Sequence, residues 1–330
     1  MNEQVNPGET VLRLAIAYWA SRCLQLVAEL GIADALGDEP QSAESLARAS
    51  GVQPRALLRV LRSLTNHGIF MHDGERFAHN DASRMLRTGA PGSMRSLARM
   101  MGLKIHWDAY RELDFSLRTG QPAIVEAAQG SFFEYLRQHP DEGRIFDEAM
   151  TGKPMPPIAD AFDFTHFKTI GDIGGGLGHL LQHVLDRSPE AHGILFDLPE
   201  VVARARERKL PRVSYVGGDF FKDPIPACDA YLMMTVLHDW SDTESVAILE
   251  NLKSAAPRAA KLLLIEGVIE PAARDDLMLD VDIEMLVMST GRERTRAEWT
   301  SLLAGAGFRL IRVIPAPPYA VIEAELDNTG

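Results

Sequence analysis

The chain has 330 residues, 46% of them hydrophobic, with a formal net charge of −12 and a pI near 5.3. This length supports one large domain or two of ordinary size, each with a hydrophobic core. The excess negative charge repels a phosphate backbone, so we expect no nucleic-acid partner unless basic residues gather on one face. Only two cysteines are present, far apart in the chain, which disfavours a disulfide framework or a thiolate zinc site and fits a reducing compartment.

The N-terminal region lacks the pattern of an export signal. Glu3 and Glu9 lie near the start, and no basic segment followed by an apolar core precedes them. The long apolar stretch at residues 11–36 is interrupted by charged side chains, Arg13 and Arg22 among them, which argues against a bilayer-spanning helix. We therefore expect a cytoplasmic protein without a membrane partner.

The first half of the chain has the periodicity of helices. Apolar residues between positions 10 and 150 recur at spacings of three and four, which predicts an almost entirely helical region. The main stripe of the first helix consists of Leu12, Ile16, Trp19, Cys23, Leu26 and Leu30. Further apolar residues lie beside this stripe, and a helix that is apolar all round is usually buried. We expect this helix to pack against a second copy of the chain in a homodimer.

Two more helices and a hairpin follow. Residues 42–51 have serine caps and a terminal glycine, and residues 53–68 form a second helical pattern. Asp73 and Gly74 between two short apolar segments predict a β-hairpin, which completes the order of a winged helix. Winged helices often bind DNA, but others are scaffolds that pack against a partner chain. Residues 1–90 contain nine Arg against ten Asp and Glu, and this balance favours the scaffold.

Three prolines between residues 151 and 162 end the helical region, and we place a domain boundary there. The prediction is a helical, winged-helix-like dimerisation domain at residues 1–155 and a catalytic domain at residues 156–330. In the second domain, continuous apolar strands alternate with helices, which predicts a parallel sheet covered by helices on both faces. The predicted fold class is therefore α/β with a Rossmann-like second domain.

The first strand of this domain runs into a glycine-rich segment, GDIGGGLGHLL at residues 171–181. Ligands of such sheets bind at the carboxyl ends of the strands, and glycine lets a ligand approach the backbone closely. A dinucleotide loop needs G-x-G-x-x-G, but its last position is His179 counted from Gly174 and Leu181 counted from Gly176. The segment has instead an acid-G-x-G-x-G form that resembles motif I of S-adenosylmethionine-dependent methyltransferases.

Acidic residues end the next two strands. Asp197 ends the second strand, where a carboxylate can accept hydrogen bonds from ribose hydroxyls. Asp219 follows the third strand, in place to pair with an adenine amine while Phe220 packs on the ring. NAD enzymes also put an acid at the position of Asp197, so that residue by itself leaves both cofactors open.

The segment after the fourth strand carries the family resemblance. Residues 236–242 read VLHDWSD, and the segments LLLIEGVIE and GRERTRAEWTSLLAGAGF follow. Over nearly its whole length the chain resembles the homodimeric small-molecule O-methyltransferases of plants and bacteria, and the bacterial enzymes of secondary metabolism are the nearer likeness. The resemblance implies S-adenosylmethionine as methyl donor, S-adenosylhomocysteine as its product, and no metal.

The resemblance also implies roles for individual residues. His238 stands where the family has its general base, Glu266 matches the acid partnered with the base, and Glu298 matches a second acid beside it. The expected cofactor contacts are Asp172, Gly174, Gly175, Gly176, Asp197, Leu198, Gly218, Asp219, Phe220 and Met234. The expected acceptor contacts are His106, Trp107, Phe133, Met150, Met285, Met288 and Ser289.

The chemistry of methyl transfer to a phenol explains these residue types. A phenol has a pKa of about 10, so its oxygen is a weak nucleophile at neutral pH. Histidine can take the proton as the oxygen attacks, and a carboxylate on the other ring nitrogen fixes the tautomer and stabilises the imidazolium. Apolar and aromatic acceptor contacts suit a broad, flat pocket for an aromatic ring. We therefore predict methyl transfer to a hydroxyl of an aromatic secondary metabolite.

One position departs from the family pattern. Plant members often have Lys four residues before the base, where this chain has Met234, so plant substrate specificity does not carry over. Three alternatives stay open: a relative that binds the same cofactor but catalyses hydroxylation or decarboxylation, an NAD(P)-dependent oxidoreductase, and a ligand-sensing transcription regulator. The sequence leaves open which acceptor is used and whether it offers oxygen, nitrogen or sulfur.

Overall fold

The chain forms two compact units. The computed structural model describes residues 6–152, 155–270 and 276–327. Unit 1 comprises Met1–Trp107 and His139–Pro154, and unit 2 comprises Asp108–Gln138 and Met155–Gly330. Unit 2 resumes at Met155, inside the proline-rich stretch where we placed the domain boundary. Lys153 and Pro154 of that stretch lie outside the described residues.

Unit 1 is mostly helical, with one small sheet. Its long first helix is α1 (Pro7–Glu29), capped by the side chain of Asn6, which accepts from the N–H of Gly8. The other elements are α2 (Ile32–Leu36), β1 (Gln41–Ser42), α3 (Ala43–Ser50), α4 (Pro54–Asn66), β2 (Met71–His72), β3 (Arg76–Ala78), α5 (Asp81–Arg84), α6 (Arg95–Met100) and α11 (Pro140–Gly152). Helix α7 (Lys104–Arg111) contains the change from unit 1 to unit 2.

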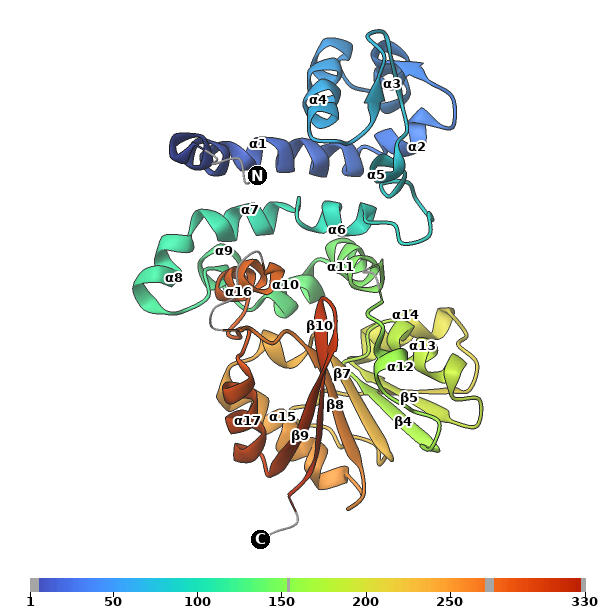
Figure 1. The fold of residues 1–330 in the computed structure, drawn as a ribbon, viewed down its shortest axis with the longest axis vertical. Helices are drawn as coiled ribbons and strands as arrows, with labels where there is room; N and C mark the ends of the chain where they lie inside the picture. The colour runs from blue at the N-terminus through green and yellow to red at the C-terminus, as the bar shows by residue number, and fades with distance from the viewer. Residues whose placement is uncertain (1–5, 153–154, 271–275, 328–330) are drawn as a thin grey trace. The chain divides into compact units, whose positions relative to one another are not determined.

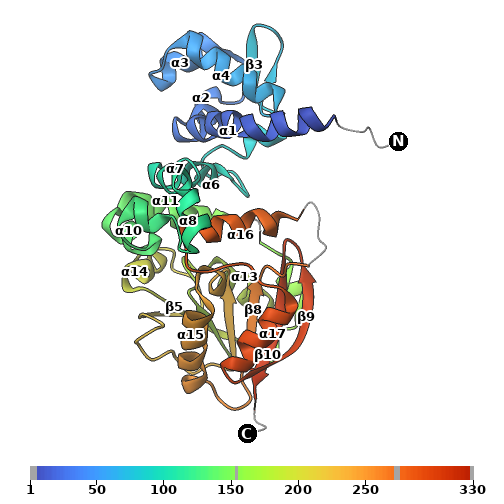
Figure 2. The same cartoon turned by 90° about the vertical axis from the view of Figure 1, so that its left-hand side faces the viewer.

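The predicted order of a winged helix is confirmed in unit 1. Ser42 caps α3 by accepting from the N–H of Ser45, and Gly51 ends that helix at φ +68°. Strands β1, β3 and β2 pair antiparallel in that order, and the Asp73 side chain accepts two backbone N–H bonds in the hairpin. Figures 1 and 2 show α3 and α4 beside this small sheet.

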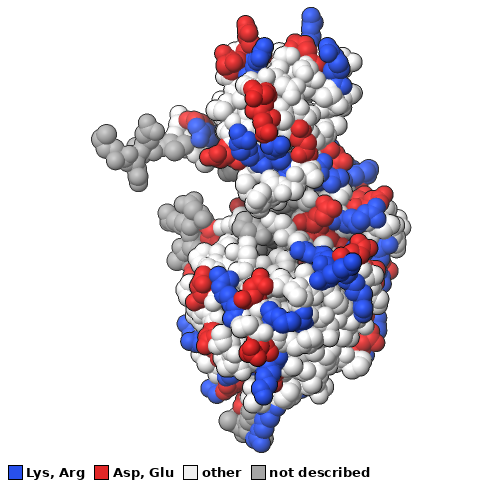
Figure 3. Space-filling view, turned by 90° about the vertical axis from the view of Figure 1, so that its right-hand side faces the viewer, with Lys and Arg blue, Asp and Glu red and all other residues white. Residues whose placement is uncertain are grey.

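Helix α1 leaves much of its apolar surface uncovered by its own chain. Val11, Leu14 and Trp19 are 68%, 74% and 56% exposed. By length and composition alone this helix could also cross a membrane, because an 18-residue window has a mean hydropathy of 1.2. The core helix of a soluble protein and a signal sequence pass the same test, so this is weak evidence, and the cytoplasmic location stays a prediction. On the face drawn in Figure 3, acidic and basic side chains are interspersed.

Unit 2 contains a seven-stranded sheet in the order β6-β5-β4-β7-β8-β10-β9. Its strands are β4 (Thr169–Ile173), β5 (His192–Asp197), β6 (Val213–Gly217), β7 (Ala230–Met234), β8 (Lys261–Glu266), β9 (Phe308–Ala316) and β10 (Tyr319–Leu326). Its helices include α8 (Leu113–Thr119), α9 (Ile124–Ala128), α10 (Phe132–Gln138), α12 (Ile158–Ala161), α13 (His179–Arg187), α14 (Pro199–Glu207), α15 (Asp242–Ala255), α16 (Leu277–Met288) and α17 (Arg296–Gly305). Each strand predicted from the sequence is present.

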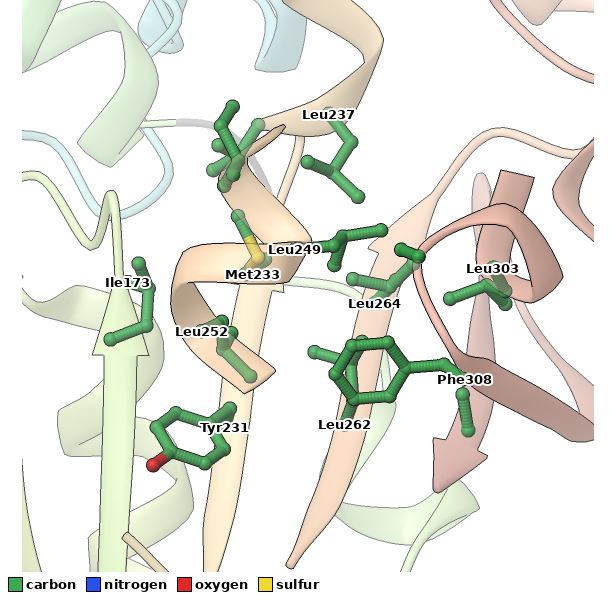
Figure 4. Packing of buried hydrophobic residues seen from close by; sticks show 14 of the residues in the cluster. Ile173, Tyr231, Met233, Leu237, Leu249, Leu252, Leu262, Leu264, Leu303 and Phe308 are labelled. Atoms are coloured by element: carbon green, nitrogen blue, oxygen red, sulfur yellow. The ribbon is translucent and has the colours of Figure 1, made fainter. Parts of the chain in front are cut away.

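Helices cover both faces of this sheet, as predicted. Successive strand residues point to opposite faces, and Leu263 and Leu264 of β8 accordingly belong to different apolar clusters. One cluster packs the sheet against α15 and α17, and Figure 4 shows Leu249, Leu252 and Leu303 from these helices over the strand residues. The other cluster packs it against α12, α13 and α14.

The sheet is not wholly parallel, which corrects the sequence expectation. Strand β10 pairs antiparallel with both β8 and β9. Only two residues separate β9 from β10, and a parallel crossover needs a dozen or more. The chain therefore turns back as a hairpin, and β10 enters between β8 and β9.

The segment Asp108–Gln138 belongs with unit 2 although it lies in the helical half of the sequence. Tyr110 donates a 2.6 Å hydrogen bond to Glu284 of α16, and the Ser116 hydroxyl donates to the carbonyl of Leu286. The sequence pattern predicts no element at α16, because this segment is apolar and acidic without a clear helical period. These contacts were therefore not foreseeable from local pattern.

Candidate active site

Two loops meet at the topological switch point of the sheet. From β4 the chain passes to β5 and β6 on one side, then returns to β7 on the other side of β4. Ligands of open α/β sheets bind where the strand order reverses in this way, outside the carboxyl ends of the strands. The glycine-rich loop follows β4 and the turn with His238 follows β7, so both border this point (Figure 1).

Glycine is required at different positions of the first loop for different structural reasons. Gly174 and Gly176 have φ values of +70° and +56°, which L side chains rarely adopt. An added Cβ at Gly174 would lie 2.9 Å from Val236, and one at Gly175 would lie 2.5 Å from Leu195. At Gly176 an added Cβ would meet nothing within 4 Å. Packing therefore explains the first two glycines, whereas Gly176 borders open space.

Asp172, at the end of β4, has an unsatisfied carboxyl oxygen. The residue is buried, and its Oδ2 has no hydrogen-bond partner among the described residues. Burial and the nearby Asp197 raise the pKa of Asp172 to about 7. A buried polar atom without a partner costs stability, and a ligand with a hydrogen-bond donor would satisfy it. This orphaned oxygen and the open space at Gly176 fit a bound group with polar and cationic parts.

Asp197 and Asp219 both lie at strand ends, as predicted. The Asp197 carboxylate accepts from the N–H of Gly176 at 2.8 Å and from that of Leu198 at 2.7 Å. The Asp219 carboxylate accepts from the N–H of Phe221 and from Lys222. Burial opposes ionisation of Asp219, but the hydrogen bonds from Lys222 and Phe221 and the nearby cationic charges together outweigh burial and lower the pKa.

The remaining cofactor candidates lie in the same unit. The N–H of Gly218 donates to the carbonyl of Asp197 at 2.9 Å, which ties the loops after β5 and β6 together. The Phe220 ring contacts Trp240 edge to face at 5.9 Å between centroids. Met234 ends β7 and is half-buried. That the cofactor touches these residues stays a prediction.

The turn after β7 is a short 3₁₀ helix, Leu237–Asp239. Just before it, Thr235 has φ +50°, a conformation that costs a non-glycine residue energy and is concentrated at functional sites. The N–H of Thr235 donates to the carbonyl of Ile265 in β8 at 3.0 Å, which holds this strained residue in place. The chain therefore turns sharply at the point where it presents His238.

His238 is buried and surrounded by carboxylates. Its Nδ1 lies 2.6 Å from Glu293 Oε1, and its Nε2 lies 3.6 Å from Asp239 Oδ1. Burial by itself would lower the pKa of His238, but Asp239, the hydrogen bond to Glu293 and the charge of Glu266 raise it to about 9. The imidazole is therefore a stronger base than an ordinary histidine.

Glu266 contacts the turn rather than the imidazole. Its Oε1 accepts from the N–H of Val236 at 3.0 Å and from that of Leu237 at 2.9 Å. The residue is fully buried, its Oε2 has no partner within the described part of the chain, and burial raises the pKa of this carboxyl to about 7. The family resemblance implies Glu266 on the second imidazole nitrogen, but in the structure Glu266 holds the backbone that carries the imidazole.

Glu298, expected as a second acid beside the base, forms its hydrogen bonds elsewhere. It closes a capping box with Thr295 at the start of α17 and pairs with Arg292. The bonds from Arg292 and Thr295 lower the pKa of Glu298 to about 2. The carboxylate on His238 is that of Glu293, which is not among the residues predicted from the sequence. Both glutamates belong to GRERTRAE, and spacing cannot tell which one reaches a histidine 55 residues away.

The acceptor candidates of unit 2 lie on α16 or near the base turn, which is the 3₁₀ helix Leu237–Asp239 that carries His238. The Phe133 ring of α10 stacks on Trp240, with 5.7 Å between centroids and 18° between planes. Met285 and Met288 are buried on α16. The Ser289 hydroxyl donates to the carbonyl of Met285.

The acceptor candidates of unit 1 have contacts within that unit. His106 is buried, and Met150 is half-buried on α11. The Trp107 indole donates to Gln25 of α1 at 3.1 Å, and the guanidinium of Arg22 lies 5.4 Å from the centre of its ring. Trp107 therefore helps to join α7 to α1, and the acceptor role of these residues stays a prediction.

Comparisons with known proteins agree with this architecture. The family model of the O-methyltransferase domain matches residues 110–309, and that of the O-methyltransferase dimerisation domain matches residues 12–89. The phenazine O-methyltransferase PhzM of Lysobacter antibioticus is 37% identical over 324 residues, 95% of each chain. The crystal structure of LaPhzM has a TM-score of 0.92 at 36% identity, over 98% of this chain and 100% of that one.

Two further relatives bear on cofactor and acceptor. The O-methyltransferase NcsB1 from neocarzinostatin biosynthesis was solved with S-adenosylhomocysteine and 1,4-dihydroxy-2-naphthoic acid. It has a TM-score of 0.79 at 30% identity, over 93% of this chain and 95% of that one. The 8-amino-8-demethylriboflavin N,N-dimethyltransferase of Streptomyces davaonensis is 36% identical over 315 residues, 91% of this chain and 90% of that one.

The chain belongs to the O-methyltransferase family and is an S-adenosylmethionine-dependent methyltransferase with a dimerisation domain. This assignment argues against the alternative function of an NAD(P)-dependent oxidoreductase. It also agrees with the broken dinucleotide pattern, because S-adenosylmethionine has no pyrophosphate. Among the described residues, no group of three or more His, Cys, Asp or Glu could hold a metal ion.

Proposed function

We propose that this enzyme transfers a methyl group to a hydroxyl of an aromatic metabolite, with His238 as general base. The observation that carries the proposal is the buried imidazole after β7, whose Nδ1 lies 2.6 Å from Glu293 Oε1. A carboxylate on Nδ1 keeps the proton of the neutral ring on that nitrogen. Nε2 is then the nitrogen that receives the proton of the acceptor.

The residues at the switch point are suited to holding the cofactor. Gly176 borders open space, the Asp172 carboxyl has an unsatisfied oxygen, and Asp197 presents a carboxylate beside the loop. When bound, S-adenosylmethionine supplies an electrophilic methyl group on a sulfonium. Gly174, Gly175, Leu198, Gly218, Asp219, Phe220 and Met234 are the further residues that we assign to its binding.

The raised pKa of His238 supports a hydroxyl acceptor. A phenol has a pKa of about 10, and a base with a pKa of about 9 takes its proton at little free-energy cost. Glu293 stabilises the imidazolium that forms, and Glu266 holds the backbone of the turn. An aromatic amine needs no proton removed before it attacks, so such an acceptor would leave this arrangement unused. Some relatives are named as N-methyltransferases, so an aromatic amine is the alternative acceptor that the test must include.

The acceptor is expected to contact Phe133, Met285, Met288 and Ser289 of unit 2. The aromatic and thioether side chains among them suit a flat ring. The ring that stacks on Phe133, Trp240, itself directly follows the base turn. A planar acceptor would then be bound close to the group that deprotonates it.

We further propose that two copies of the chain associate through α1. Its exposed apolar residues, Val11, Leu14 and Trp19 among them, form a surface that a second copy would cover. Leu14→Glu combined with Trp19→Glu should give a monomer in sedimentation velocity, whereas the unmodified chain should sediment as a dimer. A double variant that stays a dimer would assign the interface elsewhere.

The proposed reaction is tested with isotopically labelled S-adenosylmethionine and paired aromatic acceptors that differ only in carrying a hydroxyl or an amine. Label should appear on the hydroxyl compounds. His238→Asn should lower kcat by about 100- to 10,000-fold, the usual contribution of a general base, and change the affinity for S-adenosylhomocysteine by less than about threefold. Methylation of the amines alone, or a variant with near-normal turnover, would contradict the proposal.

A further inference from the structure

One buried charge beside the base turn has no part in the proposed chemistry. Arg294 is fully buried, with a relative exposure of 0%, and it directly follows Glu293. Its guanidinium lies 5.0 Å from the centre of the Trp299 ring. Burying a cation is costly unless it is paired and hydrogen-bonded, so the bonds of this side chain show what it stabilises.

The guanidinium of Arg294 binds both ends of the turn that carries His238. One terminal nitrogen donates to the carbonyl of Leu237 at 2.9 Å, and the other donates to the carbonyl of Trp240 at 2.8 Å. Nε donates to the Asp242 carboxylate at 2.9 Å. Leu237 and Trp240 flank the two residues His238 and Asp239, so one rigid group spans the whole turn.

Neighbouring groups hold the same turn from other sides. An added Cβ at Gly291 would overlap the carbonyl oxygen of His238, so the segment of residues 289–295 lies directly against the turn. The Ser245 hydroxyl lies 3.3 Å from the carbonyls of both Leu237 and Trp240. Glu266 binds the N–H groups on the opposite side of the turn.

We propose that Arg294 is a positioning residue for the general base. Its planar fork holds the two carbonyls of the turn at a fixed spacing and so keeps the imidazole of His238 in register with Glu293. The role rests on the proposed function of His238. Lysine keeps the charge but is a single flexible point donor, so it does not reproduce the planar fork that binds the two carbonyls and Asp242 at once.

The main rival explanation is that Arg294 only stabilises the fold. Arg212 offers a control, because its exposed side chain also binds main-chain carbonyls, that of Leu185 in α13 and those of Ser188, Pro189 and Ala191 just after this helix. These carbonyls lie between α13 and β5, in a different part of unit 2 from the turn after β7. Arg212→Lys removes the same kind of contact without touching the base turn.

The test compares Arg294→Lys, Arg212→Lys and the unmodified enzyme, each saturated with S-adenosylhomocysteine. The first readout is the pKa of His238, followed by NMR of histidine-labelled protein and assigned by the signal missing in His238→Asn. The charges that raise this pKa are Asp239 on the turn, Glu266 on β8 and Glu293 on the 289–295 segment. All three depend on the position of the turn, whereas a loss of global stability leaves the pKa of the folded enzyme unchanged.

In Arg294→Lys, we expect the pKa of His238 to fall by about one unit or more toward 6.5 and kcat to fall by about 100-fold, the cost of a displacement near 1 Å. The affinity for S-adenosylhomocysteine should change by less than about threefold. Arg212→Lys should lower the melting temperature and leave both the pKa and kcat unchanged. If Arg294→Lys lowers only the melting temperature, the proposal is wrong.

Failure of the proposed function and failure of the positioning role can be distinguished. If the unmodified enzyme methylates no hydroxyl but the pKa falls as expected, the proposed function fails and the positioning role stands. If Arg294→Lys does not fold, Asp242→Asn decides, because the Asp242 carboxylate accepts from Nε of Arg294 and so orients its guanidinium. This variant should lower the pKa of His238 in the same direction by less, and an unchanged pKa would then overturn the proposal.

Discussion

The loop after β4 and the turn after β7 lie at neighbouring strand ends but are built in opposite ways. The glycine loop leaves space beside Gly176 and an unsatisfied oxygen on Asp172. At the turn after β7, Glu266 binds the N–H groups, Arg294 binds the carbonyls and Glu293 binds the imidazole. The backbone of this turn is therefore held on several sides, although Oε2 of Glu266 and Oε2 of Glu293 have no partner among the described residues.

The difference fits the roles that we propose for the two loops. A cofactor that enters and leaves in every turnover needs a loop with unsatisfied polar groups. The cofactor supplies the missing hydrogen-bond partners of these groups when it binds. A general base must be held in one geometry before the reaction, because displacement costs rate. Substitutions in the first loop should therefore alter cofactor affinity, and those around the second should alter kcat.

We expect Gly291→Ala to have the largest effect on the turn that carries His238. The added methyl group overlaps the carbonyl oxygen of His238, so the turn must move. We expect kcat to fall by about 100-fold while the dissociation constant of S-adenosylhomocysteine, measured by calorimetry, changes little. A large loss of affinity with normal kcat would reverse the assignment of the two loops.

Glu293→Gln should change the pH dependence of the reaction. The base acts when unprotonated, so kcat/KM rises as pH passes through the pKa of His238, which is raised to about 9. Removing the charge of Glu293 lowers this pKa, and the rise in kcat/KM should move about one unit toward acid with a kcat about tenfold lower.

Glu298→Gln is the control for that experiment. Its carboxylate caps α17 and pairs with Arg292, so this variant should lose thermal stability and keep the pH profile. A profile that moves in Glu298→Gln but not in Glu293→Gln would return the partner role to Glu298.

Gly176→Ala tests the glycine loop. The added methyl group meets no protein atom within 4 Å, but it enters the open space and requires φ +56°. We expect the affinity for S-adenosylhomocysteine to fall by about tenfold, or about 1.4 kcal/mol, with kcat at saturating cofactor nearly unchanged. Unchanged affinity in calorimetry would mean that the cofactor does not approach this position.

Asp172→Asn should have the smallest effect, a pH-dependent gain in stability of the ligand-free enzyme. The pKa of Asp172 is raised to about 7 from an ordinary value of 3.8. The folded state therefore binds more protons than the unfolded state between these values, and its stability falls as pH rises through them. The variant should melt about 2 °C or more above the unmodified enzyme at pH 8 and gain less at pH 5. An equal difference at both pH values would contradict the cause given for the shift.

The sequence by itself determined the features that depend on local pattern. The winged-helix order, the alternation of strand and helix, the glycine loop after β4 and the position of His238 after β7 follow from periodicity, caps and turns. These signals act within a few residues of the chain, and the structure has each of them in place.

Only the tertiary structure decided which groups meet across long separations in the chain. Glu293 reaches His238 from 55 residues away, and Arg294 reaches Leu237 from 57. The segment Asp108–Gln138 joins unit 2 through contacts to α16 and Trp240. Spacing in the chain does not encode such contacts, because they depend on how the sheet and its loops place distant backbone side by side.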